Sequence, residues 1–294
     1  MIKNLIITFL VVLMPCSVYS QSRIEISGSN GELRSSKKLT VDTAQYRVVY
    51  EVKFIRNPKV PEKITTGRTL LFQGKHSALY KDFYEVLSDS VREEALCQGA
   101  SQVEAINKAL AVTGQKFREE IVQDYPKRGK ALVQEYFMAG TKRYVDDGAV
   151  QEWVLLEETM DILGYHCQKA TWRYRGRDYE AWYTEEIPIY RGPYLFAGLP
   201  GLIIKIRDSS GEYDFSMIGF EKVDNPFPLT IYDDKGIENL SREDFRFLKA
   251  YKYENPSAAL MAGGSIKLNL TPEEEKELEK RLNSPRPYNP IEKE

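Results

Sequence analysis

Apolar and polar residues alternate along residues 46–54, where every second position is aromatic or aliphatic. A period of two places successive side chains on opposite faces, so this stretch predicts a β-strand with one buried face. Shorter strand-like runs recur down the chain. They cover residues 69–72, 77–80, 133–138, 142–145, 151–155, 165–174, 179–184, 202–206, 213–220 and 229–232.

Two turn sequences join neighbouring runs directly. Arg175-Gly176-Arg177-Asp178 and Asp208-Ser209-Ser210-Gly211 both carry the glycine and short polar residues of hairpin turns. Sequential hairpins imply an antiparallel meander, and the alternation of strands and helices typical of a parallel sheet does not occur. We predict an α+β fold, mainly antiparallel β: a curved meander sheet or half-barrel over residues 43–232, with a helical insertion and C-terminal helices.

The helical insertion is expected at about residues 90–122. Apolar residues there recur at spacings of three, four or seven, which is the period of an amphipathic helix. Ser90 and Ser101 are each followed three positions later by glutamate, the pattern of a capping box. The insertion either packs on the sheet or forms a lid or partner-binding arm.

The remaining C-terminal residues predict a helical extension over residues 233–284. Ser241 precedes a short helical pattern that runs to Tyr251. Thr271 precedes Pro272 and acidic residues, which suits an N-cap, a first-turn proline and the helix dipole. Residues 285–294 contain three prolines and several charges, so a disordered tail is expected there.

The hexapeptide Gly198–Ile203 lies between two strand-like runs. Pro200 and Gly201 occupy the central positions of a type II turn, because proline fixes φ near −65° and glycine accepts positive φ. Gly198 allows a close backbone approach. The segment is either a rigid turn that sets strand register or the stem of a loop that presents a binding surface. The candidate contact residues of that surface are Tyr190, Arg191, Tyr194 and Phe196, with Trp182 on the preceding hairpin.

These motifs resemble the GLPGLI family of exported proteins from Bacteroidetes. The resemblance rests on Gly164–Ala170, Arg175–Tyr179, Ala181–Thr184 and the hexapeptide, and it covers about residues 45–222, with a weaker tail. It implies an exported protein, and the family has no established activity to carry over. This sequence departs from the family pattern at Tyr190, Arg191, Tyr194 and Ala197, all within the loop.

Composition and charge limit the partner classes. The chain has 294 residues, of which 42% are hydrophobic, and a formal charge of −2. This size allows one large domain or two small ones, and the near-neutral charge argues against nucleic acid or an anionic membrane as a partner. No cofactor or metal is expected. An envelope protein, a lipid or a peptide remains as the partner.

The first twenty residues read as a signal peptide. Lys3 precedes the apolar run Leu5–Met14, and small residues at Val18 and Ser20 allow cleavage before Gln21. Lipoprotein processing at Cys16 is the alternative. Residues 21–42 are polar and are expected to be a flexible segment. The predicted location is the periplasm or the extracellular medium, without a membrane span beyond the signal.

Cleavage after Ser20 leaves two cysteines, Cys97 and Cys167. An even pair in an oxidising compartment favours a disulfide. The alternative is two separate thiols, because sequence does not show whether the two Cα atoms come within bonding range.

Catalytic motifs are scarce. Downstream of the signal peptide the only histidines are His76 and His166, and Glu185-Glu186 is a candidate carboxylate pair for acid–base work. An envelope hydrolase or metal-dependent enzyme using these four residues is therefore one hypothesis. The preferred hypothesis is a non-enzymatic binding protein that uses the aromatic loop and a sheet face. A lipid carrier would need an apolar cavity of roughly several hundred Å³.

Overall fold

The computed structural model describes residues 37–137, 140–148, 151–233, 236–257 and 271–294. The predicted signal peptide and residues 21–36 of the predicted flexible segment lie outside this part of the chain. None of the helices in the described part has the length and apolar run that a bilayer span needs.

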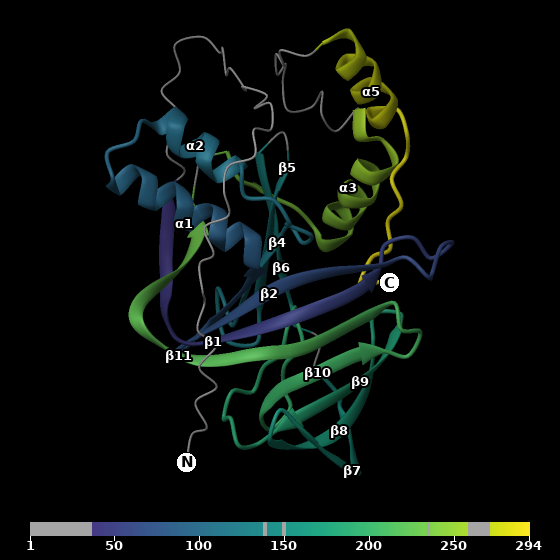
Figure 1. The fold of residues 1–294 in the computed structure, drawn as a ribbon. Helices are drawn as coiled ribbons and strands as arrows, with labels where there is room; N and C mark the ends of the chain where they lie inside the picture. The colour runs from purple at the N-terminus through teal and green to yellow at the C-terminus, as the bar shows by residue number, and fades with distance from the viewer. Residues whose placement is uncertain (1–36, 138–139, 149–150, 234–235, 258–270) are drawn as a thin grey trace.

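One open twelve-stranded sheet organises the protein (Figure 1). Its spatial order is β12-β6-β5-β4-β3-β2-β1-β11-β10-β9-β8-β7, antiparallel throughout except for the β12–β6 pair. The strands are β1 (Lys38–Ile55), β2 (Ile64–Gly74), β3 (Ala78–Asp82), β4 (Glu119–Gln123), β5 (Ala131–Phe137), β6 (Gly140–Asp146), β7 (Val154–Ile162), β8 (Tyr165–Tyr174), β9 (Arg177–Thr184), β10 (Leu202–Asp208), β11 (Tyr213–Tyr232) and β12 (Glu238–Asn239). The predicted mainly antiparallel α+β fold is confirmed.

The two central strands are longer than the pattern predicted. β11 continues through Pro226 and Pro228 because register shifts in its pairing with β1 absorb the irregular backbone. The same pairing orders residues 38–42, which the sequence assigned to the flexible segment. In Figure 1, β1 and β11 cross the middle of the molecule between β7–β10 below and the helices above.

Four helices are described: α1 (Phe83–Cys97), α2 (Gln102–Leu110), α3 (Arg242–Glu254) and α5 (Pro272–Leu282). Ser101, Ser241 and Thr271 cap three of them as predicted. The predicted start at Ser90 is wrong, because Asp82 at the end of β3 caps α1 and its carboxylate accepts the Tyr84 N–H. Residues 119–123, predicted as helix, form β4.

The sheet curves so that its two halves share one core. Tyr144 of β6 and Tyr174 of β8 belong to the same buried cluster, although their strands lie far apart in the sheet order. A smaller cluster on the opposite face includes Phe72 and Leu79 and packs against Phe83 and Val86 of α1.

The loop of residues 185–201 fills the space inside this curve. Phe196 is fully buried, and its ring packs against those of Tyr174, Tyr179 and Phe215. Polar side chains hold the loop backbone: Gln123 donates to the Tyr194 carbonyl, and Gln151 bonds both Leu195 and Ala197. The concave side of the sheet is therefore occupied by the protein's own loop.

The hexapeptide does not form the predicted type II turn. Gly198 carries the positive φ of 86°, whereas Gly201 does not adopt the left-handed region. Gly201 is required for another reason, because a Cβ there would collide with the backbone carbonyl of Thr184. The sequence correctly indicated that the hexapeptide needs its glycines, but it assigned the positive φ to Gly201 instead of Gly198.

Candidate functional site

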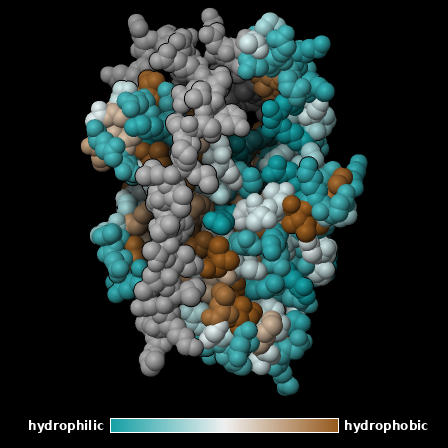
Figure 2. All heavy atoms as spheres, in the orientation of Figure 1, coloured by the Kyte–Doolittle hydropathy of each residue, from teal (hydrophilic) through white to brown (hydrophobic). Residues whose placement is uncertain are grey.

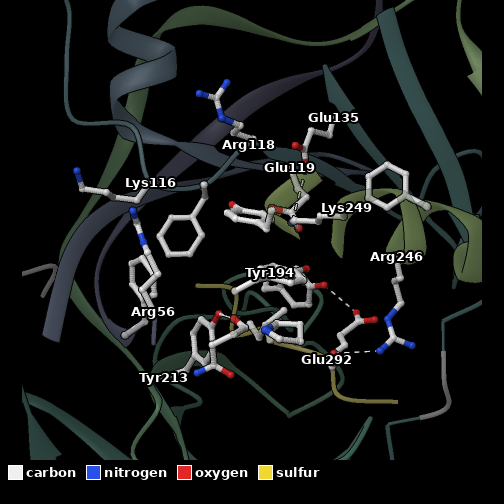
Figure 3. Close-up of a pocket in the computed structure, with 18 of the residues that line it drawn as sticks. Arg56, Lys116, Arg118, Glu119, Glu135, Tyr194, Tyr213, Arg246, Lys249 and Glu292 are labelled. Carbon is white, nitrogen blue, oxygen red and sulfur yellow. Dashed lines mark hydrogen bonds and ion pairs between the residues drawn. The ribbon is translucent and has the colours of Figure 1, made fainter. Parts of the chain in front are cut away.

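A pocket opens where β1, β4 and β5 meet α3 and the C-terminal residues (Figure 3). Its volume is about 90 Å³, enough for a side chain or a chain terminus rather than a whole lipid. Tyr194 from the central loop and Tyr213 from β11 form part of its floor. The pocket thus lies directly beside the buried loop.

Four cations surround this pocket: Arg56 after β1, Lys116 and Arg118 before β4, and Arg246 on α3. Among the described residues, none of the four bonds a side-chain carboxylate; Arg246 donates only to the backbone carbonyl of Glu292, at 3.1 Å. Figure 3 shows Arg56 beside Lys116, with Arg118 above them. We call these four residues the basic mouth.

The lysines deeper in the pocket are already neutralised. Lys249 contacts the Glu119 carboxylate, and Lys252 lies 2.7 Å from that of Glu135. Burial, followed by repulsion from Lys252, lowers the pKa of Lys249 to about 7. In the described structure Glu119 and Glu135 make ion pairs with these two lysines and none with the four cations of the basic mouth.

Aromatic rings complete the pocket wall. Tyr253 of α3 and Tyr288 stack with ring centroids 4.5 Å apart and planes 8° apart. Burial raises the pKa of both phenols and of Tyr213, so all three remain neutral at physiological pH. Neutral phenols beside cations provide stacking surface and hydrogen-bond donors to an anionic ligand.

The C-terminal residues form the remaining wall, and the predicted disorder of residues 285–294 is wrong for its buried part. Asn289 and Glu292 are 6% and 4% exposed. The Glu292 carboxylate lies 2.7 Å from Arg175 and 2.6 Å from Arg242, and it accepts a hydrogen bond from Tyr194. Charge pairing across the sheet fixes the segment, which local composition does not reveal.

The structure separates the loop residues that the sequence grouped as a contact surface. Tyr194 and Phe196 are buried, and Arg191 bonds Gln73, Gln123 and Asp124 inside the protein. Tyr190 is 60% exposed. Trp182 is half-buried on β9, where the Lys169 ammonium lies 5.8 Å from its ring centroid. Only Tyr194 reaches the pocket of Figure 3.

The two histidines of the predicted enzymatic alternative do not meet, and of its four residues only His166 and Glu186 share a hydrogen bond in the described structure. His76 lies between β2 and β3, and His166 lies on β8, with β1, β11, β10 and β9 between these strands. His166 bonds the exposed Asp161 side chain at 3.1 Å, and Glu186 accepts the His166 N–H. Within the described ranges, no group of three or more His, Cys, Asp or Glu residues is arranged to hold a metal ion.

The two cysteines are free thiols rather than a disulfide. Cys97 is exposed at the end of α1, whereas Cys167 is buried in β8. Helix α1 packs against β2 and β3, and at least four strands separate these from β8 in the sheet order.

A second polar cluster escaped sequence reasoning. Lys81 on β3 lies 2.7 Å from Glu120, 3.0 Å from Asp89 and 3.4 Å from Glu85. With three carboxylates around one ammonium, burial raises the pKa of Glu85 to about 8, reinforced by Glu120. The spacing of four between positions 81, 85 and 89 was the available signal.

A search of curated proteins found no match. Two solved structures titled "Structure of PNGF-II in P21 space group" and "Structure of PNGF-II in C2 space group" are each 16% identical, with a TM-score of 0.46 over 70% of this chain. The chain spans about a third of their length, 33% and 32%.

A family model also matches part of the chain. It covers residues 175–205, from the β8–β9 turn through the buried loop into β10. Its description is a protein of unknown function, Porph_ging.

Proposed function

We propose that this chain is an exported, non-enzymatic binding protein of the GLPGLI type, and that it binds an acidic peptide segment of a partner protein at the basic mouth. The observation that carries the proposal is the set of four cations without a side-chain carboxylate partner among the described residues. They surround an aromatic-walled pocket, in a chain whose formal charge is −2.

Electrostatics favour an acidic partner. The one other cation lining this pocket among the described residues, Lys249, contacts Glu119, so the unpaired positive charge belongs to the basic mouth. Positive charge gathered in a concave, partly desolvated site raises the association rate and specificity for anions. Three of the four cations are arginines, and arginine suits bidentate carboxylate contacts.

The size of the pocket favours a peptide over a lipid. Its 90 Å³ is below the range of about 300–1,000 Å³ typical of small-molecule sites. The buried loop with Phe196 fills the concave side where a carrier would hold an acyl chain. On the face shown in Figure 2, hydrophilic residues cover most of the described surface and apolar residues form separate groups.

Export is supported by the sequence of the first twenty residues, with Lys3 before the apolar run Leu5–Met14. An extracytoplasmic location would place the basic mouth in contact with other envelope or secreted proteins. The loop of residues 185–201 then acts as an internal scaffold that positions Tyr194 in the pocket wall.

The test uses dye-labelled hexaglutamate and hexaglutamine, with binding followed by fluorescence anisotropy at low and high salt. We expect saturable, salt-sensitive binding of hexaglutamate only. The double variant R56E/R118E should weaken it by about tenfold or more, which is about 1.4 kcal/mol. Lys222→Glu is the matched control, since Lys222 is an exposed cation on β11 outside the pocket. Equal weakening by the control, or equal binding of hexaglutamine, would overturn the proposal.

A further inference from the structure

Residues 289–292 lie in a groove whose side chains form hydrogen bonds with their backbone carbonyls. Each carbonyl from Asn289 to Glu292 accepts a hydrogen bond from a side chain of another element. The donors are Tyr213 for Asn289, Arg177 for Pro290 at 2.7 Å, Tyr179 for Ile291 at 3.1 Å and Arg246 for Glu292 at 3.1 Å. Four consecutive carbonyls are therefore bound by β9, β11 and α3.

Two side chains of this segment enter buried polar sites. The Asn289 amide accepts from Arg177 at 2.8 Å and donates to the carbonyl of Ile55 at 2.8 Å. Glu292 lies between Arg175 and Arg242. The two sites are three positions apart along an irregular segment that bends at Ile291, so the groove binds both the backbone and two side chains of this segment.

This arrangement is a mode of peptide recognition rather than of sheet or helix formation. The segment belongs to no strand or helix, and side-chain donors replace a strand ladder. Side chains that bind main-chain carbonyls accept many sequences, whereas buried pockets for particular side chains supply selectivity. The donors lie on regular elements, so the groove is held in place by the sheet and α3.

The tether to this segment is weak. Helix α5 precedes it, and no residue of α5 is buried. The described contacts just upstream of Asn289 are the Arg286 N–H bond to the Tyr253 carbonyl and the Tyr253–Tyr288 stack. Most of the interactions that hold residues 289–292 are thus made by the groove itself.

We propose that this groove is a peptide-binding site whose resident ligand is the chain's own C-terminal segment, and that it accepts the same segment from a second copy of the chain. The ligand class is a peptide with asparagine and, three residues later, a carboxylate side chain, in the irregular conformation of residues 289–292. Exchange of an identical segment between copies is a low-cost route to association. The inference rests on the proposed function, because it makes a peptide the partner at this end of the molecule.

The first experiment removes the segment and supplies it in trans. A variant ending at Ser284 is titrated with a dye-labelled peptide of residues 284–294, and anisotropy reports binding. We expect saturable binding, with Asn289→Ala and Glu292→Gln peptides each weaker by about tenfold or more. A peptide of the same composition in scrambled order is the control. Binding of the scrambled peptide at equal strength would overturn the inference.

A second measurement decides the case in which the shortened variant fails to fold. A protease site is inserted between Asn283 and Ser284 in the full chain, and the cleaved protein is followed by circular dichroism during dilution and peptide addition. Reversible loss and recovery of signal with added peptide supports a ligand bound in trans. Loss without recovery shows a fixed part of the fold and overturns the inference.

The mouth variant R56E/R118E separates this inference from the proposed function. Neither residue contacts residues 289–292 by a hydrogen bond in the described structure, so binding of the 284–294 peptide should be unchanged. Loss of hexaglutamate binding with retained tail-peptide binding supports both ideas. If the 284–294 peptide binds but hexaglutamate does not bind even to the protein with Arg56 and Arg118 intact, the proposed function is overturned and the present inference stands.

Discussion

Arg175 donates a hydrogen bond to the carboxylate of Glu292 over 2.7 Å, although 117 positions separate them in sequence. Arg175 occupies the β8–β9 turn with φ 45°, followed by Gly176 with φ 79°, the left-handed pair of a type I′ hairpin. The same guanidinium contacts Asp146 at the end of β6. One turn residue therefore joins the two halves of the sheet and the C-terminal segment.

Glu292→Gln is expected to destabilise the protein by about 3–5 kcal/mol at pH 7, because it leaves Arg175 and Arg242 buried without their shared carboxylate. Burial alone would raise the pKa of Glu292, but the two arginines outweigh it and hold that pKa below its usual value. The carboxylate therefore contributes stability above its unfolded pKa of about 4.3 and loses it as pH falls through the folded value.

Urea unfolding at pH 7 and pH 3.5 measures this dependence. The difference between wild type and Glu292→Gln should shrink at the lower pH. Glu294→Gln is the control, since the Glu294 side chain is 70% exposed and should change stability by less than about 0.5 kcal/mol. A difference that stays constant with pH would contradict the assigned charge state.

Glu85→Gln should stabilise the protein by about 1–3 kcal/mol at pH 9 and have little effect at pH 5. The pKa of Glu85 is raised to about 8 by burial, so folding favours its protonated form. Wild type then loses stability as pH rises from about 4.3 through 8, whereas the amide does not. Thermal unfolding across pH 5–9 provides the comparison.

Glu93 lies on the same helix and its carboxylate is exposed, so Glu93→Gln serves as the control. If Glu85→Gln costs stability at pH 9 as well, the ion pair with Lys81 outweighs burial and our assignment fails.

Gly201→Ala should destabilise by about 3 kcal/mol or more, because the new Cβ meets the Thr184 carbonyl and the backbone must move. Gly198→Ala should cost only about 1–2 kcal/mol, from a left-handed conformation in which the new Cβ would make only an ordinary contact, 3.6 Å from the Gln151 Cβ. Chemical denaturation of both variants gives the comparison. A larger loss of stability in Gly198→Ala than in Gly201→Ala would show that backbone conformation, rather than the contact with Thr184, limits substitution in the hexapeptide.

Phe196→Ala should cost about 3–5 kcal/mol, since it empties the centre of the ring cluster inside the sheet. Tyr190→Ala, on the same loop but exposed, should stay within about 0.5 kcal/mol. Measuring both unfolding and hexaglutamate binding for each variant shows whether the residue stabilises the fold or contacts the ligand. Lost binding in Tyr190→Ala with unchanged stability would restore the loop as a recognition surface.

Maleimide should label one thiol in the native protein without the first twenty residues, and two after unfolding in urea. Cys97 is exposed, whereas burial raises the pKa of Cys167 to about 11 and keeps its thiol protonated. Cys97→Ser should abolish native labelling, and mass spectrometry assigns the sites. Absence of labelling in both states without reductant would indicate a disulfide instead.

Much of the fold followed from local pattern. The alternation at residues 46–54 gave the central strand, and the turns at Gly176 and Gly211 gave the hairpins. Ser101 and Thr271 marked helix starts because a cap acts on N–H groups within the next turn. Asp82 was missed although its cap bond to the Tyr84 N–H is local, and its further bonds to the N–H groups of Lys116 and Phe117 join positions far apart in the chain.

The sequence predicted much less of the candidate site than of the fold. Loop composition correctly indicated a special aromatic segment, but alternation does not show what covers a face, and the curved sheet buried Phe196 and Tyr194. Arg56 and Arg118 are ordinary charges in sequence, and only folding placed them around one pocket.

By itself, the sequence determined most of the strands, the two hairpin turns and three of the helix starts, because those choices depend on neighbours within a few positions. Tertiary structure decided how the sheet curves, which loop fills it and which arginines hold Glu292, because these depend on contacts between residues far apart in the chain. Arg175 illustrates both: its turn is local, but its partners are not.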